Sequence, residues 1–449
     1  MSAENRSLRR EVAPPASAPI EFHPRGPLVG RLIPPGDKSI SHRALFLGAI
    51  SSGSSRVCNI CPGEDIRHTV SVLRALGVSI RSEEGIYEID GVGLRGLREP
   101  DDVLDCGNAG TGARLLLGLL AAQPFAFVVT GDPSLRRRPM DRVIRPLVEL
   151  GAHLDGRCAG ARLPVFGRGD RLKPARTVFR TASAQVKSSL LLAALCAQEP
   201  LRIQELQPTR DHTEIGLCAR GVSLAREGDR LRLAPTDALR PMDQRIPGDL
   251  SSAAFFIVAA SIIPGSRLYV EGVGINPRRR GIIDVLVEMG AAIDVIPRES
   301  LEGEPVADLV VRASELAGIQ IGPSRVPSVI DEIPVVCIAA AFARGRTEIR
   351  GAGDLRWKES DRIRVMARML GGAGVRVEER DDGLIIEGGF SHAALVDVDP
   401  DLDHRVAMAA AVLGCARRGG CRVSGFGCVR TSYPGFLETL RGMRGDERS

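Results

Sequence analysis

Residues 113–122 read Ala-Arg-Leu-Leu-Leu-Gly-Leu-Leu-Ala-Ala, and this stretch is apolar on almost every side of a helix. A helix of this kind is expected to lie inside a domain rather than on its surface. Residues 125–130 then have the composition of a strand, and residues 141–150 that of a polar outer helix ending at Gly151. The stretch predicts a unit in which an inner helix, a strand and an outer helix follow one another.

This unit recurs six times along the chain. Each time, an apolar helix rich in small residues is followed by a short strand, a polar helix, a Gly-Ala or Gly-Val pair and a second strand, as at 291–296 and 375–377. The inner helices are expected to begin near Lys38, Asn108, Gln185, Asp249, Asp331 and His404. A regular period of this kind indicates repeated βα units that pack against their neighbours.

The repeats predict an α/β fold: a two-domain inside-out α/β barrel of βαβαββ-like units, three per domain, with helices inside and sheets outside. Crossovers are expected at 34–36 and 244–248, near a cleft between the halves. The domains would therefore comprise residues 38–246 and residues 26–37 plus 247–449, with the first strand in the carboxy-terminal half. Residues 1–25 are proline-rich, lack an apolar signal core and are expected to be a disordered leader.

Composition limits the possible functions. The net charge is +5, from 60 basic against 55 acidic residues, and the clusters at 136–138 and 278–280 indicate nucleic acid or small anions as partners. Because basic residues exceed acidic ones only slightly, small anions are favoured over nucleic acid as partners. The longest apolar run, 253–263, is shorter than the roughly 20 residues that cross a bilayer. Cys58 and Cys61 form a C-x-x-C without a second pair, so reduced thiols of a cytoplasmic protein are favoured over a metal or redox site.

Five polar groups lie near the predicted helix starts, where free backbone N–H groups bind anions. They are 34–43, 107–114, 136–139, 183–188 with 209–212, and 328–334 with 357–362. Each group alone also fits a structural interpretation: a capped surface helix, tight helix packing, solvated charges or an exposed ion-pair lattice. Their recurrence at equivalent points of successive repeats favours an anion-binding site.

The groups at 34–43 and at 328–334 with 357–362 contain the residues best suited to anion binding and acid–base catalysis. Lys38 lies at the positive end of its helix, but no G-x-x-x-x-G-K-[ST] phosphate loop occurs in the chain. The glycines at 91–96 match G-x-G-x-x-G, yet acidic residues follow them, which favours a turn between strands over a dinucleotide site. Lys358 and Arg362 form an i, i+4 pair with Glu359 one turn from Arg362, so a cation and a carboxylate are expected to face one cleft.

Together these motifs resemble those of 5-enolpyruvylshikimate-3-phosphate (EPSP) synthases, in the family's order and over roughly residues 27–440. The motifs that carry the resemblance are 35–43, 107–111, 138–140, 358–362 and 403–405. The resemblance implies transfer of the enolpyruvyl group of phosphoenolpyruvate to the 5-hydroxyl of shikimate 3-phosphate, with release of phosphate, in the shikimate route to aromatic amino acids. It also implies that no metal or organic cofactor is needed. A monomer is expected, with no nucleic-acid or membrane partner.

The resemblance also implies residue roles. Shikimate 3-phosphate would be bound by Lys38, Ser39, Arg43, Ser183, Ala184, Gln185, Arg210, Asp331 and Lys358. Phosphoenolpyruvate would be bound by Lys38, Asn108, Gly110, Arg138, Gln185, Arg362 and Arg405. Asp331 would be the base for the 5-hydroxyl, alone or together with Glu332, and Glu359 the acid that protonates the methylene carbon, with Lys38 completing the catalytic set. Protonation of one carbon as a hydroxyl attacks its neighbour requires an acid and a base on opposite sides of the bond.

Two positions depart from the family pattern. Thr431 stands where many members have a lysine, and Arg430 is a candidate for its replacement. Together with Thr431, residues 184–187 and 209–214 resemble the divergent bacterial branch that includes glyphosate-tolerant enzymes. In contrast, Gly110 stands where well-known tolerant members have alanine. Because no Cβ fills this space, sensitivity to glyphosate is expected.

Two other functions are weighed against this one. The related UDP-N-acetylglucosamine enolpyruvyl transferases share the fold and donor but use a loop cysteine, and residues 133–138 contain none. An RNA-binding module would interleave aromatic residues with its cations, but the chain has one Trp and three Tyr. Both alternatives are therefore disfavoured.

Overall fold

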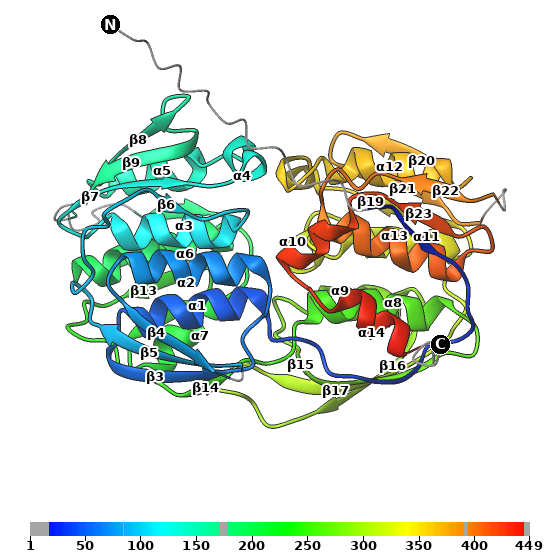
Figure 1. The fold of residues 1–449 in the computed structure, drawn as a ribbon, viewed down its shortest axis with the longest axis horizontal. Helices are drawn as coiled ribbons and strands as arrows, with labels where there is room; N and C mark the ends of the chain where they lie inside the picture. Colours follow the sequence, from blue (N-terminus) through cyan, green and yellow to red (C-terminus); the bar gives the residue numbers. More distant parts are fainter. Residues whose placement is uncertain (1–17, 84, 170–171, 173–177, 390–393, 444–449) are drawn as a thin grey trace, which may run out of the picture.

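The computed structural model describes residues 18–83, 85–169, 172, 178–389 and 394–443. Two halves lie side by side and are joined by strands along one end (Figure 1). Helices fill the middle of each half and sheets lie outside them. The predicted α/β fold of repeated units, with helices inside and sheets outside, is confirmed.

The six predicted inner helices all form, and each begins within two residues of its expected position. They are α1 (Lys38–Ala49), α3 (Gly110–Leu120), α6 (Ala184–Ala197), α8 (Leu250–Ile262), α11 (Ile333–Phe342) and α13 (His404–Ala416). Burial is nearly complete on all sides: every residue of α8 from Leu250 to Ser261 is buried. Small side chains make this possible, because helix axes can approach one another closely where Ala and Gly replace larger residues.

Most of the outer helices are shorter than the inner ones, and all of them are partly exposed. They are α2 (Glu64–Ala75), α5 (Asp141–Glu149), α7 (His212–Ala219), α9 (Gly281–Glu288), α12 (Arg362–Gly372) and α14 (Phe436–Gly442). Short additional turns are α4 (Pro133–Arg137), α10 (Val326–Val329), η1 (Gly353–Trp357) and η2 (Phe426–Thr431). The predicted outer helix at 141–150 is thereby confirmed to within one residue.

Three four-stranded sheets surround the inner helices of the amino-terminal half. In order, they are β14 (Gln244–Arg245), β3 (Ser52–Cys58), β5 (Ile86–Val92) and β4 (Ser79–Glu83); β6 (Leu104–Asp105), β7 (Ala126–Thr130), β9 (Arg162–Arg168) and β8 (His153–Arg157); and β10 (Phe179–Thr181), β11 (Leu201–Glu205), β13 (Arg230–Leu233) and β12 (Leu224–Glu227). Each sheet has one parallel pair followed by two antiparallel pairs.

The carboxy-terminal half repeats this pattern in two sheets and varies it in the third. The sheets are β16 (Ala292–Pro297), β17 (Val306–Arg312), β15 (Arg267–Gly274) and β2 (Val29–Leu32); β18 (Gln320–Ile321), β19 (Arg346–Ile349), β21 (Gly383–Glu387) and β20 (Arg376–Arg380); and β1 (Ile20–Phe22), β23 (Cys421–Val423) and β22 (Val396–Val398). In the part of the chain that is described, each sheet keeps its own edges, so the barrel is three separate sheets per half rather than one closed cylinder.

Two chain segments cross between the halves and pair with each other. Strand β2, which precedes α1, lies parallel to β15 from the carboxy-terminal part of the chain. Strand β14, from the end of the amino-terminal half, returns to β3. Between them, the Asp37 N–H donates to Pro247 O at 2.9 Å and the Asp249 N–H to Pro35 O at 2.8 Å. These bonds place the starts of α1 and α8 next to each other.

The expectation of a disordered leader over 1–25 is wrong for its last part. Ile20–Phe22 forms β1, antiparallel to β23, and the ring of Phe22 lies 5.2 Å from that of Phe426. Apolar Ile20 and Phe22 flank the polar Glu21, and this alternation is typical of a half-buried strand. Burial of Phe22 in the core stabilises the pairing. Residues 1–17 lie outside the described residues.

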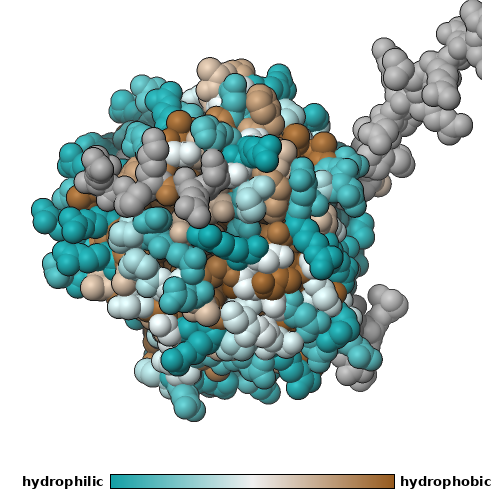
Figure 2. Space-filling model, turned by 90° about the vertical axis from the view of Figure 1, so that its left-hand side faces the viewer, coloured by the Kyte–Doolittle hydropathy of each residue, from teal (hydrophilic) through white to brown (hydrophobic). Residues whose placement is uncertain are grey.

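Buried apolar side chains form two separate clusters. One comprises residues between Ile40 and Ile246, and the other comprises Phe22, Leu28 and Leu32 together with residues between Leu250 and Met443. On the outer face of the amino-terminal half, hydrophilic side chains predominate, with hydrophobic residues between them (Figure 2). Among the described residues, no helix is both long and apolar enough to span a bilayer.

Candidate active site

A cavity of about 130 Å³ lies between the two halves and is lined by both of them. Thirteen of the fifteen predicted site residues line it: Lys38, Ser39, Arg43, Gly110, Arg138, Ala184, Gln185, Arg210, Asp331, Lys358, Glu359, Arg362 and Arg405. These residues span more than 360 positions of sequence, so only the fold brings them together. The predicted convergence on one cleft is therefore observed in the structure.

Four of the inner helices, α1, α3, α6 and α13, direct their amino ends at this cavity. Lys38 is the first residue of α1, Gly110 the first of α3, and Arg405 the second of α13. Asp37 caps α1 by accepting from the Ile40 N–H at 2.9 Å, and Asp403 caps α13 in the same way. Free N–H groups and helix dipoles thus add to the positive charge of the side chains.

Lys38 is held by Asp65, the second residue of α2. Its ammonium nitrogen lies 2.8 Å from a carboxylate oxygen of Asp65, and both side chains are largely buried. Burial alone would lower the pKa of Lys38, but the charge of Asp65 outweighs burial and raises the pKa above its usual value. Lys38 therefore remains a fixed cation at neutral pH.

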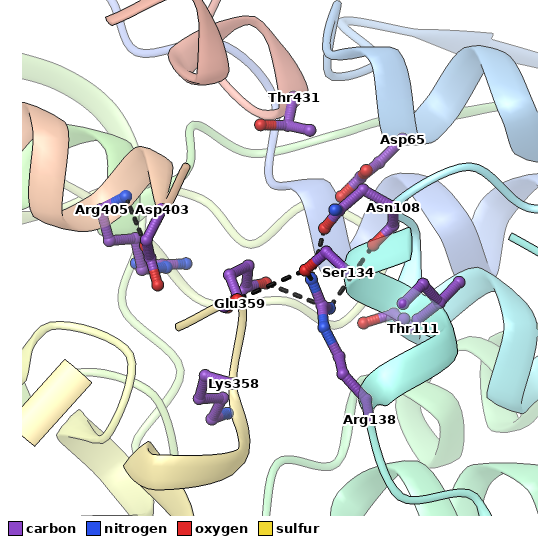
Figure 3. Close-up of polar contacts among 12 residues, drawn as sticks. Asp65, Asn108, Thr111, Ser134, Arg138, Lys358, Glu359, Asp403, Arg405 and Thr431 are labelled. Carbon is purple, nitrogen blue, oxygen red and sulfur yellow. Dashed lines mark hydrogen bonds and ion pairs between the residues drawn. The ribbon is translucent and has the colours of Figure 1, made fainter. Parts of the chain in front are cut away.

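Arg138 connects the two halves across the cavity. One of its guanidinium nitrogens lies 3.3 Å from Glu359 Oε1 (Figure 3). Asn108, which was predicted to bind phosphoenolpyruvate, does not line the cavity: its amide oxygen accepts from Arg138 and its amide nitrogen donates to Asp132 at 2.7 Å. Asn108 thus orients Arg138 rather than facing the cavity, because its side chain is already engaged by these two partners.

Three cations surround the Asp331 carboxylate. Arg210 from the amino-terminal half approaches one oxygen to 2.6 Å, while Lys358 and Arg362 approach the other to 3.2 and 3.6 Å. Burial alone would raise the pKa of Asp331, but the charges of Lys358 and Arg210 outweigh it and hold the pKa well below its usual range. Without a ligand, Asp331 is therefore ionised.

Glu332 does not share this environment. It does not line the cavity, and its side chain is fully buried beneath Ser251 and Arg279, with Arg279 Nη1 2.8 Å from Glu332 Oε1. Arg405 donates to the Asp331 carbonyl at 3.0 Å and lies 3.5 Å from Glu332 Oε1. Glu332 therefore anchors Arg405, and of the two adjacent carboxylates only Asp331 lines the cavity.

Glu359 lies between two arginines. Its carboxylate contacts Arg362 at 2.5 Å as well as Arg138 at 3.3 Å, and the backbone carbonyl accepts from Ser134 Oγ at 3.3 Å. Burial would raise the pKa of Glu359, yet Arg138 and Arg362 together hold it well below its usual range. The carboxyl is ionised in the free protein, so any role as an acid requires the charges around it to change.

The polar group at 357–362 was expected to open an outer helix, but only its last residue is helical. Residue Trp357 ends the short turn η1, Lys358 is extended, and α12 begins only at Arg362, capped by Asp361. Lys358 and Arg362 therefore do not share a helical face. Their side chains meet at Asp331 because the chain bends sharply before α12.

Two further expectations differ from the structure. Ser183, at the N-cap of α6, does not line the cavity, whereas the next residues, Ala184 and Gln185, do. Arg430 does not line it either: its side chain is 71% exposed, with Glu64 at 3.9 Å. Thr431 donates to the Cys428 carbonyl within its own turn. Arg430 is therefore not positioned to replace the family lysine.

Several residues that line the cavity were not predicted from the sequence. Asp65, Arg142 and Asp354 belong to none of the recognised motifs, although Asp65 carries the common signal of an acid in the first turn of a helix. Altogether, nine cationic side chains line the cavity against four carboxylates, an excess of five positive charges. His404 is neutral, because burial and Lys38 lower its pKa well below the usual value. Such a cavity fits ligands with several negative charges.

No group of three or more His, Cys, Asp or Glu side chains in the described part of the chain has the geometry of a metal site. The sequence model of the EPSP synthase (3-phosphoshikimate 1-carboxyvinyltransferase) family matches residues 22–440. The chain belongs to the EPSP synthase family. Its motifs, fold and cavity agree with this membership.

Relatives support the EPSP synthase assignment over almost the whole chain. The 3-phosphoshikimate 1-carboxyvinyltransferases of Syntrophotalea carbinolica and Geobacter sulfurreducens are each 46% identical to it, covering 94% of this chain and 98% of theirs. A solved EPSP synthase from Acinetobacter baumannii superimposes with a TM-score of 0.83 at 40% identity, covering 95% of this chain and 98% of that one. The enolpyruvyl transferase NikO from Streptomyces tendae, at 18% identity and a TM-score of 0.74, shares the fold.

Proposed function

We infer that the protein transfers the enolpyruvyl group of phosphoenolpyruvate to the 5-hydroxyl of shikimate 3-phosphate, releasing phosphate. One observation carries the inference: nine cations and four carboxylates, an excess of five positive charges, are contributed by both halves and meet in one cavity. The two substrates together bring two phosphates and two carboxylates. Cations in a cavity with little water offset their mutual repulsion far better than they would in bulk solvent.

We propose residue roles from this geometry. Lys38, Ser39, Arg43, Ala184, Gln185, Arg210 and Lys358 would hold shikimate 3-phosphate, with Asp331 facing its 5-hydroxyl. Ser183 precedes Ala184 in the chain but does not line the cavity. Lys38, Gly110, Arg138, Gln185, Arg362 and Arg405 would hold phosphoenolpyruvate, with Asn108 orienting Arg138. The placement of Lys38 as a fixed cation supports a role in charge stabilisation rather than proton transfer.

The chemistry assigns different tasks to the two acids. Protonation of the methylene carbon creates positive charge on the neighbouring carbon, which the 5-hydroxyl attacks as it loses its proton. We assign the first proton transfer to Glu359 and the second to Asp331. The Glu359 carboxylate then takes a proton back from the methyl group as phosphate leaves the adduct, which regenerates the carbon–carbon double bond, so atoms and charges balance without a cofactor.

Ligand binding would activate both acids. In the free protein, cations hold the pKa values of Asp331 and Glu359 low. When substrate anions engage the same cations, the cations stabilise the two carboxylates less, and both pKa values rise. Glu359 can then carry a proton, and Asp331 becomes a stronger base.

A phosphate-release assay tests the function. Inorganic phosphate should appear from phosphoenolpyruvate only when shikimate 3-phosphate is present. Release that depends instead on UDP-N-acetylglucosamine would assign the protein to the related transferases, and release with neither acceptor would contradict both functions. A buffer without added divalent metal provides the test of cofactor independence.

Glyphosate inhibition provides a second prediction, at Gly110. An added Cβ would lie 2.9 Å from Arg138 Nη1 and 3.0 Å from Arg114 Nη1, so both flexible guanidinium ends would have to move. The wild type is expected to be sensitive, and Gly110→Ala to need about tenfold more glyphosate for half inhibition, with a smaller rise in the KM for phosphoenolpyruvate. Inhibition curves at fixed phosphoenolpyruvate measure this.

Gly371→Ala is the matched control, because a Cβ there makes only ordinary contact, 3.8 Å from Val377. It should leave inhibition unchanged. Weak and equal inhibition of the wild type and Gly110→Ala would refute the steric explanation.

We further propose that residues 38–246 and residues 26–37 plus 247–449 are the two domains, which is supported by the two hydrophobic clusters. We also propose that the protein acts as a monomer. A cytoplasmic location is supported by the ten cysteines, all of them free thiols.

A further inference from the structure

The three arginines at 278–280 do not form the anion-binding patch that their sequence suggests. Arg279 is buried against Glu332, and Arg280 pairs with Asp284 on the surface of α9 at 2.9 Å. Arg278 points toward the other half of the molecule, where it contacts Glu205 and Asp211. The proposed function uses none of these three side chains to bind a substrate, so the position of Arg278 requires a separate explanation.

Arg278 reaches the loop that carries Arg210. It lies between β15 and α9 in the carboxy-terminal half, whereas Arg210 lies between β11 and α7 in the amino-terminal half. One guanidinium nitrogen of Arg278 donates to the Thr209 carbonyl at 2.9 Å, and Nε lies 3.0 Å from the Asp211 carboxylate. A single guanidinium group thus holds both chain neighbours of Arg210.

The loop is also fixed from its own side. Glu205 accepts from Thr209 Oγ1 at 2.6 Å and pairs at 2.6 Å with the fully buried Lys187. Arg278 donates to the other Glu205 oxygen at 3.1 Å. Because Glu205 is itself buried and charged, its several cationic partners offset the cost of burial.

A second contact between the halves supports the first. Asn276 donates to the Asp211 carboxylate at 2.9 Å and accepts from the Arg278 backbone N–H at 2.9 Å. Beside it, His212 lies 2.7 Å from Glu304. The segment 209–212 is therefore attached to the carboxy-terminal half on both sides of Arg210, whose own guanidinium group reaches Asp331 in that half.

We propose that Arg278 is a positioning residue for shikimate 3-phosphate: by clamping Thr209 and Asp211 it fixes Arg210 relative to Asp331. The inference rests on the proposed function and adds a residue to it that touches no substrate. The clamp keeps the cation for the substrate phosphate and the base for the hydroxyl at a set separation, although they belong to different halves. An arginine suits this task because its planar fork binds two acceptors at fixed angles, which a lysine cannot do.

A double-mutant cycle tests the proposal. Arg278→Met should raise the Kd for shikimate 3-phosphate by about tenfold, while changing the KM for phosphoenolpyruvate less than about twofold. In the Arg210→Met background, the same substitution should have almost no further effect on the Kd, because Arg278 acts through Arg210. Titration calorimetry with shikimate 3-phosphate measures the Kd of all four proteins.

The controls separate positioning from a general loss of structure. Arg280→Met, which removes an exposed ion pair from the same run, should bind like the wild type. Arg278→Lys retains the charge and is the milder variant if Arg278→Met unfolds; it should show an intermediate Kd. Three results would overturn the proposal. Arg278→Met could raise the Kd equally in both backgrounds, it could bind shikimate 3-phosphate as tightly as the wild type, or it could lose affinity equally for both substrates. Failure of the wild type to bind shikimate 3-phosphate would refute the proposed function itself.

Discussion

Replacing Glu359 by glutamine is expected to lower kcat by about three orders of magnitude, with the KM for phosphoenolpyruvate unchanged or lower. Glutamine has nearly the same shape but has no proton that it can donate to carbon. It also lacks the charge that pairs with Arg138 at 3.3 Å and Arg362 at 2.5 Å, so both arginines become freer to bind an anion. Steady-state kinetics with each substrate varied in turn measures both effects.

Proton uptake provides an independent check on Glu359. Its carboxyl is ionised in the free protein, because the nearby arginines outweigh burial and hold the pKa low. Substrate anions that engage these arginines raise the pKa, so the complex should take up protons near neutral pH. Calorimetry in two buffers with different heats of ionisation should detect this uptake in the wild type and less of it in Glu359→Gln.

The control for this variant is Glu315→Gln, which alters a 77% exposed carboxylate paired with Arg344. It should match the wild type in kcat and in proton uptake. If Glu359→Gln behaves like this control, Glu359 is not the acid.

The second large effect is expected for Asp331→Asn. Its kcat should fall by about two to three orders of magnitude, because an amide cannot accept the hydroxyl proton. Affinity for shikimate 3-phosphate should stay the same or increase, since Arg210 and Lys358 lose a competing carboxylate at 2.6 and 3.2 Å. Kinetics combined with direct measurement of ligand binding separates the loss of turnover from the change in affinity.

Two comparisons make the Asp331 result specific. Asp294→Asn alters a 58% exposed side chain that pairs with Arg312, so it should change neither kcat nor the affinity for shikimate 3-phosphate. Glu332→Gln disturbs a fully buried pair with Arg279, so we expect a lower Tm together with weaker positioning of Arg405. An Asp331→Asn protein that retains its kcat and only loses affinity would show that Asp331 binds substrate without acting as the base.

Local sequence signals were sufficient for most of the fold. Inner helices such as α3 and α8 are apolar on all sides, so burial is their only stable environment and their limits follow from composition. The strand Ile20–Phe22 differs from the expected disordered leader, because three residues are too short for a strand signal without the partner β23. Strand pairing is a long-range property, and the sequence near residue 20 contains no information about residue 421.

Residues of the candidate site could be predicted from the sequence where they belong to a recognisable motif. Lys38, Arg138 and Glu359 belong to motifs whose composition already indicates anion binding. Asp65, Arg142 and Asp354 could not be predicted, because an isolated charge reveals neither its exposure nor its partner. Arg142 and Asp354, 212 residues apart, meet at 3.3 Å only because the halves face each other.

The sequence by itself determined the repeat, the inner helices and the set of charged motifs, since periodicity and helix starts depend on near neighbours. The tertiary structure alone decided what similar residues do. Asp331 and Glu332 are adjacent carboxylates, yet Ser251 of α8 and Arg279, which precedes α9, bury only Glu332. Arg278 and Arg280 differ in what lies opposite them. Burial and choice of partner set the charge and the freedom of a side chain, and both depend on elements that are distant in the chain.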